Sequence, residues 1–381
     1  MKVTQIFDIM NATTEEVLGR TEVVNEDLSN IVDVGEEIIN TDNVDNYVRK
    51  LVNHIGKVIF VNRRYEGGVP SVVMDGWEFG SILEKVSADL PQATESDTWK
   101  LEHGKSYDDD IFYQPSVSAK FFNSKITFEI PMSFTERQVK ESFSNQNQLN
   151  GFLSMLTTAI ENSMTVKLDN LIMRTINNMT GETIAGDTTG VRAVNLLEKY
   201  NTEYDETLTP EMAIKTPDFI RYASYILGLY SDRITRISTL FNEGAKERFT
   251  PASDRHVVLL SDFAKSSDVY LKADVGSDLI SLPEHETVPY WQGSGTEYDF
   301  DSVSKIDVVT ASGETVEQTG ILGVMFDRNA LGVANLDRRV TTNYNASAEF
   351  YTNFYKFDAG YFNDLNENFI VFYVGETVVG E

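Results

Sequence analysis

NQNQLNGFLSMLTTAIENSMTVKLDNLIMRTINNMT, residues 145–180, is the stretch of sequence that decides the fold. Its apolar residues recur at steps of three and four, which keeps them on one face of an α-helix. These residues are Leu149, Phe152, Leu153, Leu156, Ile160, Met164, Leu168, Leu171, Ile172, Ile176 and Met179. Gly181 follows as a typical stop signal, and the predicted helix is roughly 50 Å long. We expect it to be a structural spine; the alternative is a long core helix of an ordinary α+β enzyme.

The composition limits the classes of protein that this chain can belong to. Its 381 residues suffice for two or three units of ordinary size, and 41% of them are hydrophobic, enough for a core. Cysteine is absent, which excludes disulfides and cysteine-based zinc sites. No apolar run of about 18 residues occurs, so no membrane contact is predicted. The start lacks a basic segment followed by an apolar one, so no secretory signal is predicted.

The charge is strongly acidic, at −27, and unevenly distributed. Residues 120–180 carry 6 basic and 5 acidic side chains, a net charge of +1, whereas residues 181–320 carry 12 and 24, a net charge of −12. Duplex DNA binding needs Lys and Arg at the phosphates, so sequence-specific DNA binding is not expected. The acidity predicts either repulsion of a polyanion or basic partners, or it serves solubility alone.

The N-terminal segment is predicted to be an arm with helical pieces. Residues 1–45 are polar and acidic, and Thr13-Thr14-Glu15-Glu16 is typical of a capping box that opens a short helix. Apolar spacing predicts a helix over residues 44–56, followed by a strand at 58–61 and a turn at 65–68. Such an arm buries little of its own surface.

Residues 76–134 have the pattern of a large β-hairpin. Residues 80–90 and 116–134 alternate as strands do, and a polar connection of about twenty residues, with Trp99 in its middle, joins them. Because an isolated hairpin is only marginally stable, we expect this one to project and to lie on another subunit. The alternative is a functional lid loop.

The second half of the chain predicts an α/β unit followed by C-terminal strands. Helices are expected near residues 190–200, 217–230, 232–242 and 262–271. A loop is expected over residues 293–301, because Gly293 and Gly295 precede an acidic run. Strands are expected at residues 256–260, 306–309, 321–326, 349–358 and 369–374.

The C-terminal sixty residues carry a recognisable motif set. The segments are Asp327-Arg328, Ala330-Leu331-Gly332, Thr341-Thr342, Tyr344-Asn345, Asn353-Phe354-Tyr355-Lys356, Asp358, Asn363-Asp364 and Glu367-Asn368. Together they resemble the C-terminal signature of the major capsid proteins of tailed bacteriophages. The resemblance implies an α+β chain with the Hong Kong-97-type viral capsid fold. It also implies five segments: an N-terminal arm and first helix (1–75), an extended hairpin loop (76–134), a spine helix of the peripheral domain (135–181), an axial α/β domain (182–335) and C-terminal peripheral strands (336–381).

The same resemblance implies a structural function. The chain would be a shell subunit that assembles with itself, as hexamers and pentamers, into an icosahedral or prolate phage head around double-stranded DNA. It would be part of the virion and be assembled in the host cytoplasm. Because only about seventy-five residues precede the hairpin, a separate scaffolding protein is expected, and a portal with it. The alternatives are an encapsulin-like nanocompartment shell and, remotely, a hydrolase with an acidic site.

The candidate site residues are therefore assembly elements, namely Trp99, Lys100 and Lys105 in the hairpin loop and Leu156 and Ile160 on the helix. Carboxylates flank both lysines and favour the charged ammonium, whereas a covalent link through lysine needs the neutral amine. The sequence therefore predicts a non-covalent shell.

No catalytic, cofactor or metal site is predicted. The sequence holds no phosphate-binding glycine loop, and its histidines, His54, His103, His256 and His285, lack ligand spacing. Three weaker patterns each have two interpretations. Asp108-Asp109-Asp110 is a cation site or a solvated charge run, Glu284 with Glu286 is an acid–base pair or a chance neighbourhood, and Tyr290-Trp291 stacks on a ligand or packs in a core.

Overall fold

The architecture comes from a computed structural model of the chain. It describes residues 11–14, 70–74, 82–91, 93, 95, 99–106, 112, 114–135, 146–273, 282–293 and 297–380. Residues 11–14 are helical. The rest of the predicted arm, the helix at 44–56, the strand at 58–61, the turn at 65–68 and the acidic run at 108–110 lie outside the described residues. In the part that is described, no helix is long and apolar enough to cross a membrane.

The predicted long helix is confirmed as α5 (Gln146–Gly186), whose 41 residues span about 60 Å. Every residue of the predicted apolar face from Ile160 onward is buried. The sequence predicts that the helix stops at Gly181, but in the structure it continues through this residue to Gly186. A β-carbon at Gly181 would collide with Cγ2 of Val308 on β8 (Ile306–Val309). This glycine therefore allows a strand to approach the helix closely rather than ending it.

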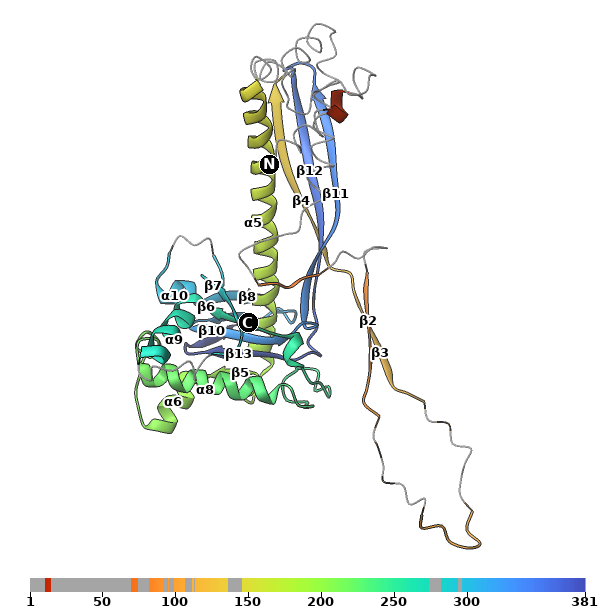
Figure 1. Ribbon diagram of the computed structural model, residues 1–381, viewed down its shortest axis with the longest axis vertical. Helices are drawn as coiled ribbons and strands as arrows, with labels where there is room; N and C mark the ends of the chain where they lie inside the picture. The colour runs from red at the N-terminus through yellow and green to blue at the C-terminus, as the bar shows by residue number, and fades with distance from the viewer. Residues whose placement is uncertain are drawn as a thin grey trace.

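A four-stranded sheet runs along the upper part of α5 (Figure 1). Its order is β1 (Val73–Met74), β11 (Leu331–Asn345), β12 (Phe350–Asn363) and β4 (Lys125–Thr135), and β11, β12 and β4 are antiparallel. Alternate residues of β4, such as Phe128 and Ile130, face the core that α5 shares with this sheet. Pro131 is tolerated because β4 is an edge strand.

A five-stranded sheet forms the centre of the lower body. Its order is β5 (Ala193–Asn195), β13 (Phe369–Tyr373), β10 (Ile321–Asp327), β6 (Arg255–Leu260) and β7 (Glu286–Val288). On one face, Val258 and Val324 join the core around α5. On the other face, Val257 and Met325 pack with helices α6 (Leu196–Tyr204), α8 (Pro217–Arg233) and α9 (Ser261–Ala273). Burial on both faces explains the continuous apolar runs of its central strands.

The remaining described elements are short. A three-stranded sheet has the order β14 (Thr377–Gly380), β9 (Thr315–Gln318) and β8. The helices α7 (Pro210–Ala213), η1 (Ala252–Asp254) and α10 (Phe300–Val303) lie in connections.

Two further predictions of secondary structure were wrong. The helix expected over residues 232–242 is absent: α8 ends at Arg233, and Ser238 pairs with Arg248 in an isolated bridge. Ile237 and Leu240 are exposed, so their helical spacing did not mark a core face. The strand expected over residues 116–134 is two strands, β3 (Val117–Phe122) and β4, which pair with different partners.

Candidate assembly site

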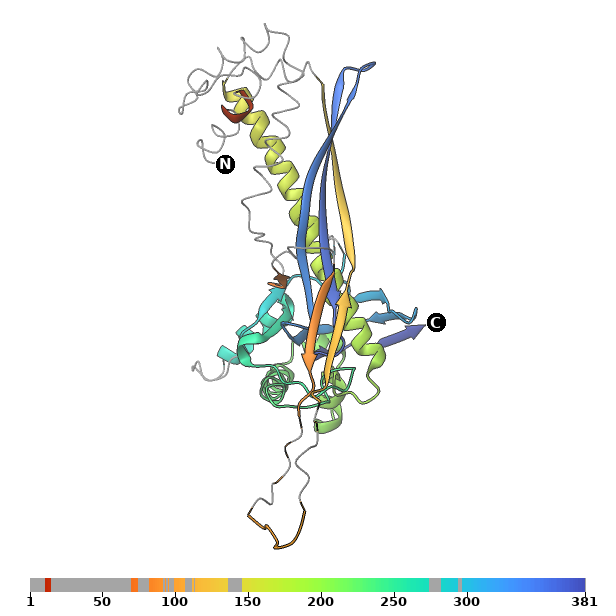
Figure 2. The same cartoon turned by 90° about the vertical axis from the view of Figure 1, so that its right-hand side faces the viewer.

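The hairpin is built from β2 (Leu83–Ala88) and β3, paired antiparallel with Lys85 opposite Lys120. It projects from the body as a separate two-stranded ribbon (Figures 1 and 2). Residues 99–106 lie at its far end, well away from every labelled element. A two-stranded ribbon is stable only when something else fixes it, so its contacts decide what it can do.

The two faces of the hairpin differ in polarity. The half-buried face carries Lys85, Ser87, Ser118 and Lys120, with Leu83 and Phe122 at one end. The opposite face is exposed and largely apolar: Val86, Val117 and Phe121 are 60%, 57% and 65% exposed, the exposed Ala88 and Ala119 lie between them, and the exposed Glu84 lies opposite Phe121. Sheets that have one solvated face normally direct polar residues outward. The order is reversed here, so we call Val86, Ala88, Val117, Ala119 and Phe121 the outer apolar face.

An ionic anchor holds the polar face to the body. Lys85 Nζ donates to Asp364 Oδ2 and to Glu367 Oε1, both at 2.7 Å, and to the carbonyl of Asn329 at 3.2 Å, which uses all three ammonium donors. Lys120 Nζ donates to Asp364 Oδ1 at 2.8 Å. Two lysines directly opposite each other would repel, and the carboxylate of Asp364 between them removes that cost. We define Lys85, Lys120, Asp364 and Glu367 as the anchor.

The electrostatics of Asp364 follow from this geometry. Its carboxylate is buried, which alone would raise its pKa, but the hydrogen bonds from Lys120 and Lys85 and the charge of Lys85 outweigh burial. The pKa of Asp364 therefore lies below its usual value. Arg248 Nε lies 3.4 Å from Glu367 Oε1 and brings a third cation to the cluster. The carboxylate of Asp364 therefore stays ionised at neutral pH.

Further contacts fix the base of the hairpin. The rings of Phe122 and Phe362 lie 5.1 Å apart, and Lys246 Nζ lies 3.4 Å from Asp89 Oδ1. Asp89 also accepts a hydrogen bond from Ser116 at 2.7 Å, and the bonds from Ser116 and Lys246 lower its pKa. In the described part of the chain, an aromatic pair and two sets of ionic contacts attach the hairpin, while its outer apolar face stays exposed.

Several motif residues from the C-terminal part form a second, buried polar network behind the anchor. Thr250 Oγ1 donates to Asp327 Oδ2 at 2.8 Å, and Asn368 Nδ2 donates to Thr250 Oγ1 at 3.1 Å. The backbone N–H of Asp327 donates to the carbonyl of Asn368 at 3.0 Å. These bonds join the end of β10 to the start of β13. They hold the Asp364–Glu367 turn in place.

The structure places the predicted assembly residues in two regions. Trp99 (90% exposed), Lys100 and Lys105 are exposed at the hairpin tip, where Lys105 Nζ lies 3.4 Å from Glu102. Ile160 is fully buried in the core of α5. Leu156 lies in the same helix, and its side chain lies outside the described part. The hairpin and helix residues are not brought together in one site.

The anchor residues were not predicted. The usable signal was local: polar residues recur at every second position, Lys85 and Ser87 in one strand and Ser118 and Lys120 in the other, which indicates that one face of the ribbon meets acidic partners. What the sequence did not reveal was the partner, because Lys85 and Asp364 are 279 residues apart.

Several residues that the sequence offers as catalytic or ligand-binding candidates make contacts within the fold. Glu286 accepts hydrogen bonds from the N–H and hydroxyl of Ser71. His256 stacks on Phe326 at 5.5 Å, and burial lowers its pKa. Trp291 is buried and donates Nε1–H to the carbonyl of Ile321 at 2.9 Å, which favours the core-packing interpretation for this residue. Within the described residues, no group of His, Asp and Glu is arranged to hold a metal ion.

Comparison with known protein families identifies the family of this chain. The family model described as Phi29-like phage major capsid protein matches residues 10–373, nearly the whole chain. The chain belongs to the Phi29-like phage major capsid protein family. This capsid protein is thus a structural subunit of a phage head shell, a component of the virion that assembles with copies of itself.

Solved structures agree with the family at the level of the fold. The capsid structure of Staphylococcus phage Andhra is similar to this capsid protein with a TM-score of 0.50 and 11% identity, over 82% of this chain and 85% of that chain. The capsid structure of the cyanophage P-SCSP1u has a TM-score of 0.45 and 11% identity, over 82% and 93%. No curated protein sequence matches this chain. The chain is therefore an α+β capsid protein whose fold resembles that of the Andhra capsid.

Proposed function

We propose that this capsid protein has the Hong Kong-97-type layout and builds a closed icosahedral or prolate head from hexamers and pentamers, with the hairpin lying across a neighbouring subunit. The observation that carries the proposal is the reversed polarity of the hairpin. Its polar face is already occupied by the anchor, so the outer apolar face is the surface left for a partner. Contiguous exposed apolar surface of this kind is typical of protein contacts.

The proposed segments are the arm (1–75), the extended loop (76–134), the spine (135–181), the axial domain (182–335) and the C-terminal peripheral part (336–381). The position of α5 beside β4, β11 and β12 supports a peripheral unit built on the spine. The five-stranded sheet with α6, α8 and α9 supports an axial unit. β13 lies in this second sheet, so the C-terminal part contributes to both units.

The test is a substitution on the outer apolar face. Phe121→Ser removes a side chain that is 65% exposed, so the free energy of unfolding of the subunit should change by no more than about 0.5 kcal/mol. Assembly should nevertheless fail, because the ring fills the proposed intersubunit contact. Tyr225→Ser on α8, which is 64% exposed, is the matched control and should leave particles intact. Normal particles from Phe121→Ser, seen by electron microscopy, would rule out the hairpin as an assembly element.

The remaining proposals concern partners. The net charge of −27 supports a shell that encloses double-stranded DNA without sequence-specific binding, since the packaged polyanion is repelled rather than held. The resemblance to tailed-phage capsid proteins supports a separate scaffolding protein, a portal and assembly in the host cytoplasm. Expressed alone, the chain should give aberrant or unclosed particles, and uniform closed shells would contradict the need for a scaffold.

A further inference from the structure

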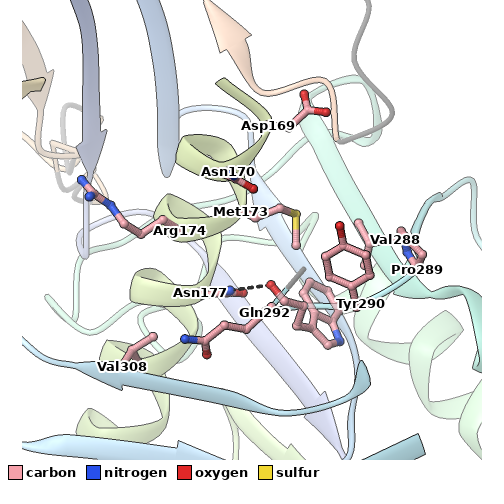
Figure 3. Close-up of a pocket in the computed structure, with 12 residues that line it drawn as sticks. Asp169, Asn170, Met173, Arg174, Asn177, Val288, Pro289, Tyr290, Gln292 and Val308 are labelled. Carbon is pink, nitrogen blue, oxygen red and sulfur yellow. Dashed lines mark hydrogen bonds between the residues drawn. The ribbon is translucent and has the colours of Figure 1, made fainter. Parts of the chain in front are cut away.

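A cavity of about 360 Å³ lies between one side of α5 and residues 288–293 (Figure 3). Its size falls within the range of small-molecule sites. Met173, Val288, Tyr290 and Val308 supply apolar and aromatic wall, and α5 adds polar groups to it. The assembly site described above uses none of these residues.

The walls of the cavity are fixed before anything enters. The backbone N–H of Trp291 donates to the carbonyl of Val303 at 3.0 Å, and its ring N–H is bonded to Ile321. The side-chain amide of Gln292 accepts from the N–H of Asp307 at 2.6 Å and donates to its carbonyl at 3.1 Å. A preformed cavity loses little free energy to reorganisation when it binds a guest.

Two oxygen acceptors in this cavity have no hydrogen-bond donor in the part of the chain that the structure describes. Asn177 is only 4% exposed, and its Nδ2 donates to the carbonyl of Trp291 at 2.6 Å. This bond fixes the amide, so Oδ1 is the atom left without a donor. Oδ1 of Asp169 is likewise buried and without a donor. Buried acceptors are nearly always satisfied in folded proteins, so each of these two oxygens is a place where a guest in the cavity can donate a hydrogen bond.

The carboxylate of Asp169 determines which kind of hydrogen-bond donor suits the cavity. Burial raises the pKa of Asp169, as expected for a carboxylate without a neutralising neighbour. Arg174 lines the same cavity but points away from Asp169 in Figure 3, and its guanidinium lies 5.1 Å above the ring of Tyr361. A guest must therefore bring N–H donors and positive charge, whereas an anion would meet the carboxylate.

We propose that this cavity binds a primary alkylammonium whose ammonium group pairs with Asp169 and whose far end donates a second N–H to Asn177. The two residues are eight positions apart on α5, which places their α-carbons about 12 Å apart along the helix. Two N–H···O bonds take up roughly 6 Å of this span. The remainder fits a chain of about four methylene groups, which would lie against Met173 and Tyr290.

Two kinds of molecule can supply the alkylammonium group. One is a free diamine with a four-carbon chain. The other is a lysine of a second copy of this chain, in which four methylenes and the α-carbon separate the ammonium from the backbone N–H of the same residue. Binding to the unassembled subunit and to assembled shells separates the two.

The experiment is calorimetric titration of the unassembled subunit with 1,4-diaminobutane. The wild-type chain should bind it, and Asp169→Asn should weaken binding about 10- to 100-fold, as expected for loss of one charge-assisted hydrogen bond. Asp262→Asn on α9 is the matched control: burial also raises the pKa of Asp262, but this residue does not line the cavity, so binding should be unchanged. Butane-1,4-diol, which has the same length without charge, should bind more weakly than the diamine.

Thermal melting of the Asp169→Asn variant shows whether weaker binding comes from the lost carboxylate or from unfolding. The substitution is nearly isosteric and removes the charge of a half-buried carboxylate whose Oδ1 has no donor, so the variant should melt at or above the wild-type temperature. Diamine binding to both subunit and shell supports a free ligand. Binding to the subunit alone supports a lysine that fills the cavity on assembly. Absence of binding to the folded wild-type subunit, or equal binding by Asp169→Asn, would overturn the proposal.

Discussion

Removing the central carboxylate of the hairpin anchor, by Asp364→Asn, should loosen the hairpin and lower the stability of the subunit. Asp364 is buried and accepts hydrogen bonds from Lys85 at 2.7 Å and Lys120 at 2.8 Å. Asparagine keeps one acceptor oxygen but loses the charge and turns an amide donor toward an ammonium. Lys85 then retains Glu367 and a carbonyl, whereas Lys120 loses its carboxylate partner in the anchor.

The magnitude follows from the exposure of the partners. Breaking a fully buried ion pair costs about 3–5 kcal/mol, and an exposed pair contributes about 0–1 kcal/mol. Asp364 is buried, but the side chain of Lys85 is 21% exposed and that of Lys120 is 43% exposed, so both lysines recover part of their hydration. We therefore expect a loss of about 1–3 kcal/mol in the free energy of unfolding.

The assay is urea unfolding combined with hydrogen exchange of the amides in β2 and β3. Asp358→Asn is the matched control, because Asp358 pairs with Arg339 at 2.8 Å, and Arg339 is 43% exposed and outside the anchor. The control should cost about 0–1 kcal/mol and leave hairpin protection unchanged. The reasoning fails if Asp364→Asn costs no more than the control and its hairpin amides exchange at the wild-type rate.

The pH dependence supplies a second check. The folded-state pKa of Asp364 is depressed, so its contribution to stability is present above the unfolded value of about 3.9 and is lost as pH falls through the folded value. The stability difference between wild type and Asp364→Asn should therefore be constant above about pH 5 and shrink as the solution is made more acid. A difference that grows toward low pH would contradict the assigned sign.

Three further predictions concern the core, a turn and the finished shell. Ile160→Ala should lower the free energy of unfolding by about 2–5 kcal/mol in urea titrations, because the side chain is fully buried, and an unchanged midpoint would show that α5 is not packed there. Gly320→Ala should lower the melting temperature strongly, since Gly320 has φ +67° and a β-carbon would collide with the backbone of Gly375; an unchanged temperature would show that the turn can shift. Mature particles boiled in detergent should give a single band near 42.9 kDa, because Lys100 and Lys105 are exposed at the hairpin tip, and a ladder of dimers and larger species would show covalent linkage.

The parts of the fold that the sequence predicts are those set by local periodicity. The apolar face of α5 repeats over many turns, and the strand at Val257–Leu260 is apolar on both sides, so each carries its own signal. No local sequence signal marks the boundary between β3 and β4, because the alternation of apolar and polar residues continues through both strands while the paired strand changes from β2 to β12. The helix expected after Arg233 failed for the converse reason, since an apparently helical spacing belonged to exposed residues.

The candidate site depends even more on contacts between distant residues. Trp99, Lys100 and Lys105 stand out in a polar connection of the sequence, and all three are exposed in the structure. The anchor joins Lys85 and Lys120 to Asp364 and Glu367, which no spacing rule connects. The motif Asn363-Asp364 and Glu367-Asn368 marked the right turn of the chain, but its physical role appears only when the hairpin lies beside it.

The proposed intersubunit contact would give the hairpin two sources of stabilisation, one within its own subunit and one from the neighbouring subunit. Within one subunit, ion pairs set its direction, and such pairs fix geometry while adding little net free energy. Its apolar side chains are buried only when a partner covers them: Val86, Val117 and Phe121 would each contribute at most about 1.5–3 kcal/mol, less the part of each that is already covered. One hairpin contact is therefore weak enough to form and break while a shell closes. If the hairpin lies across a neighbouring subunit as proposed, the same contact repeated on every subunit stabilises the closed shell, with the anchor directing each hairpin and the outer apolar face contributing to the free energy of assembly.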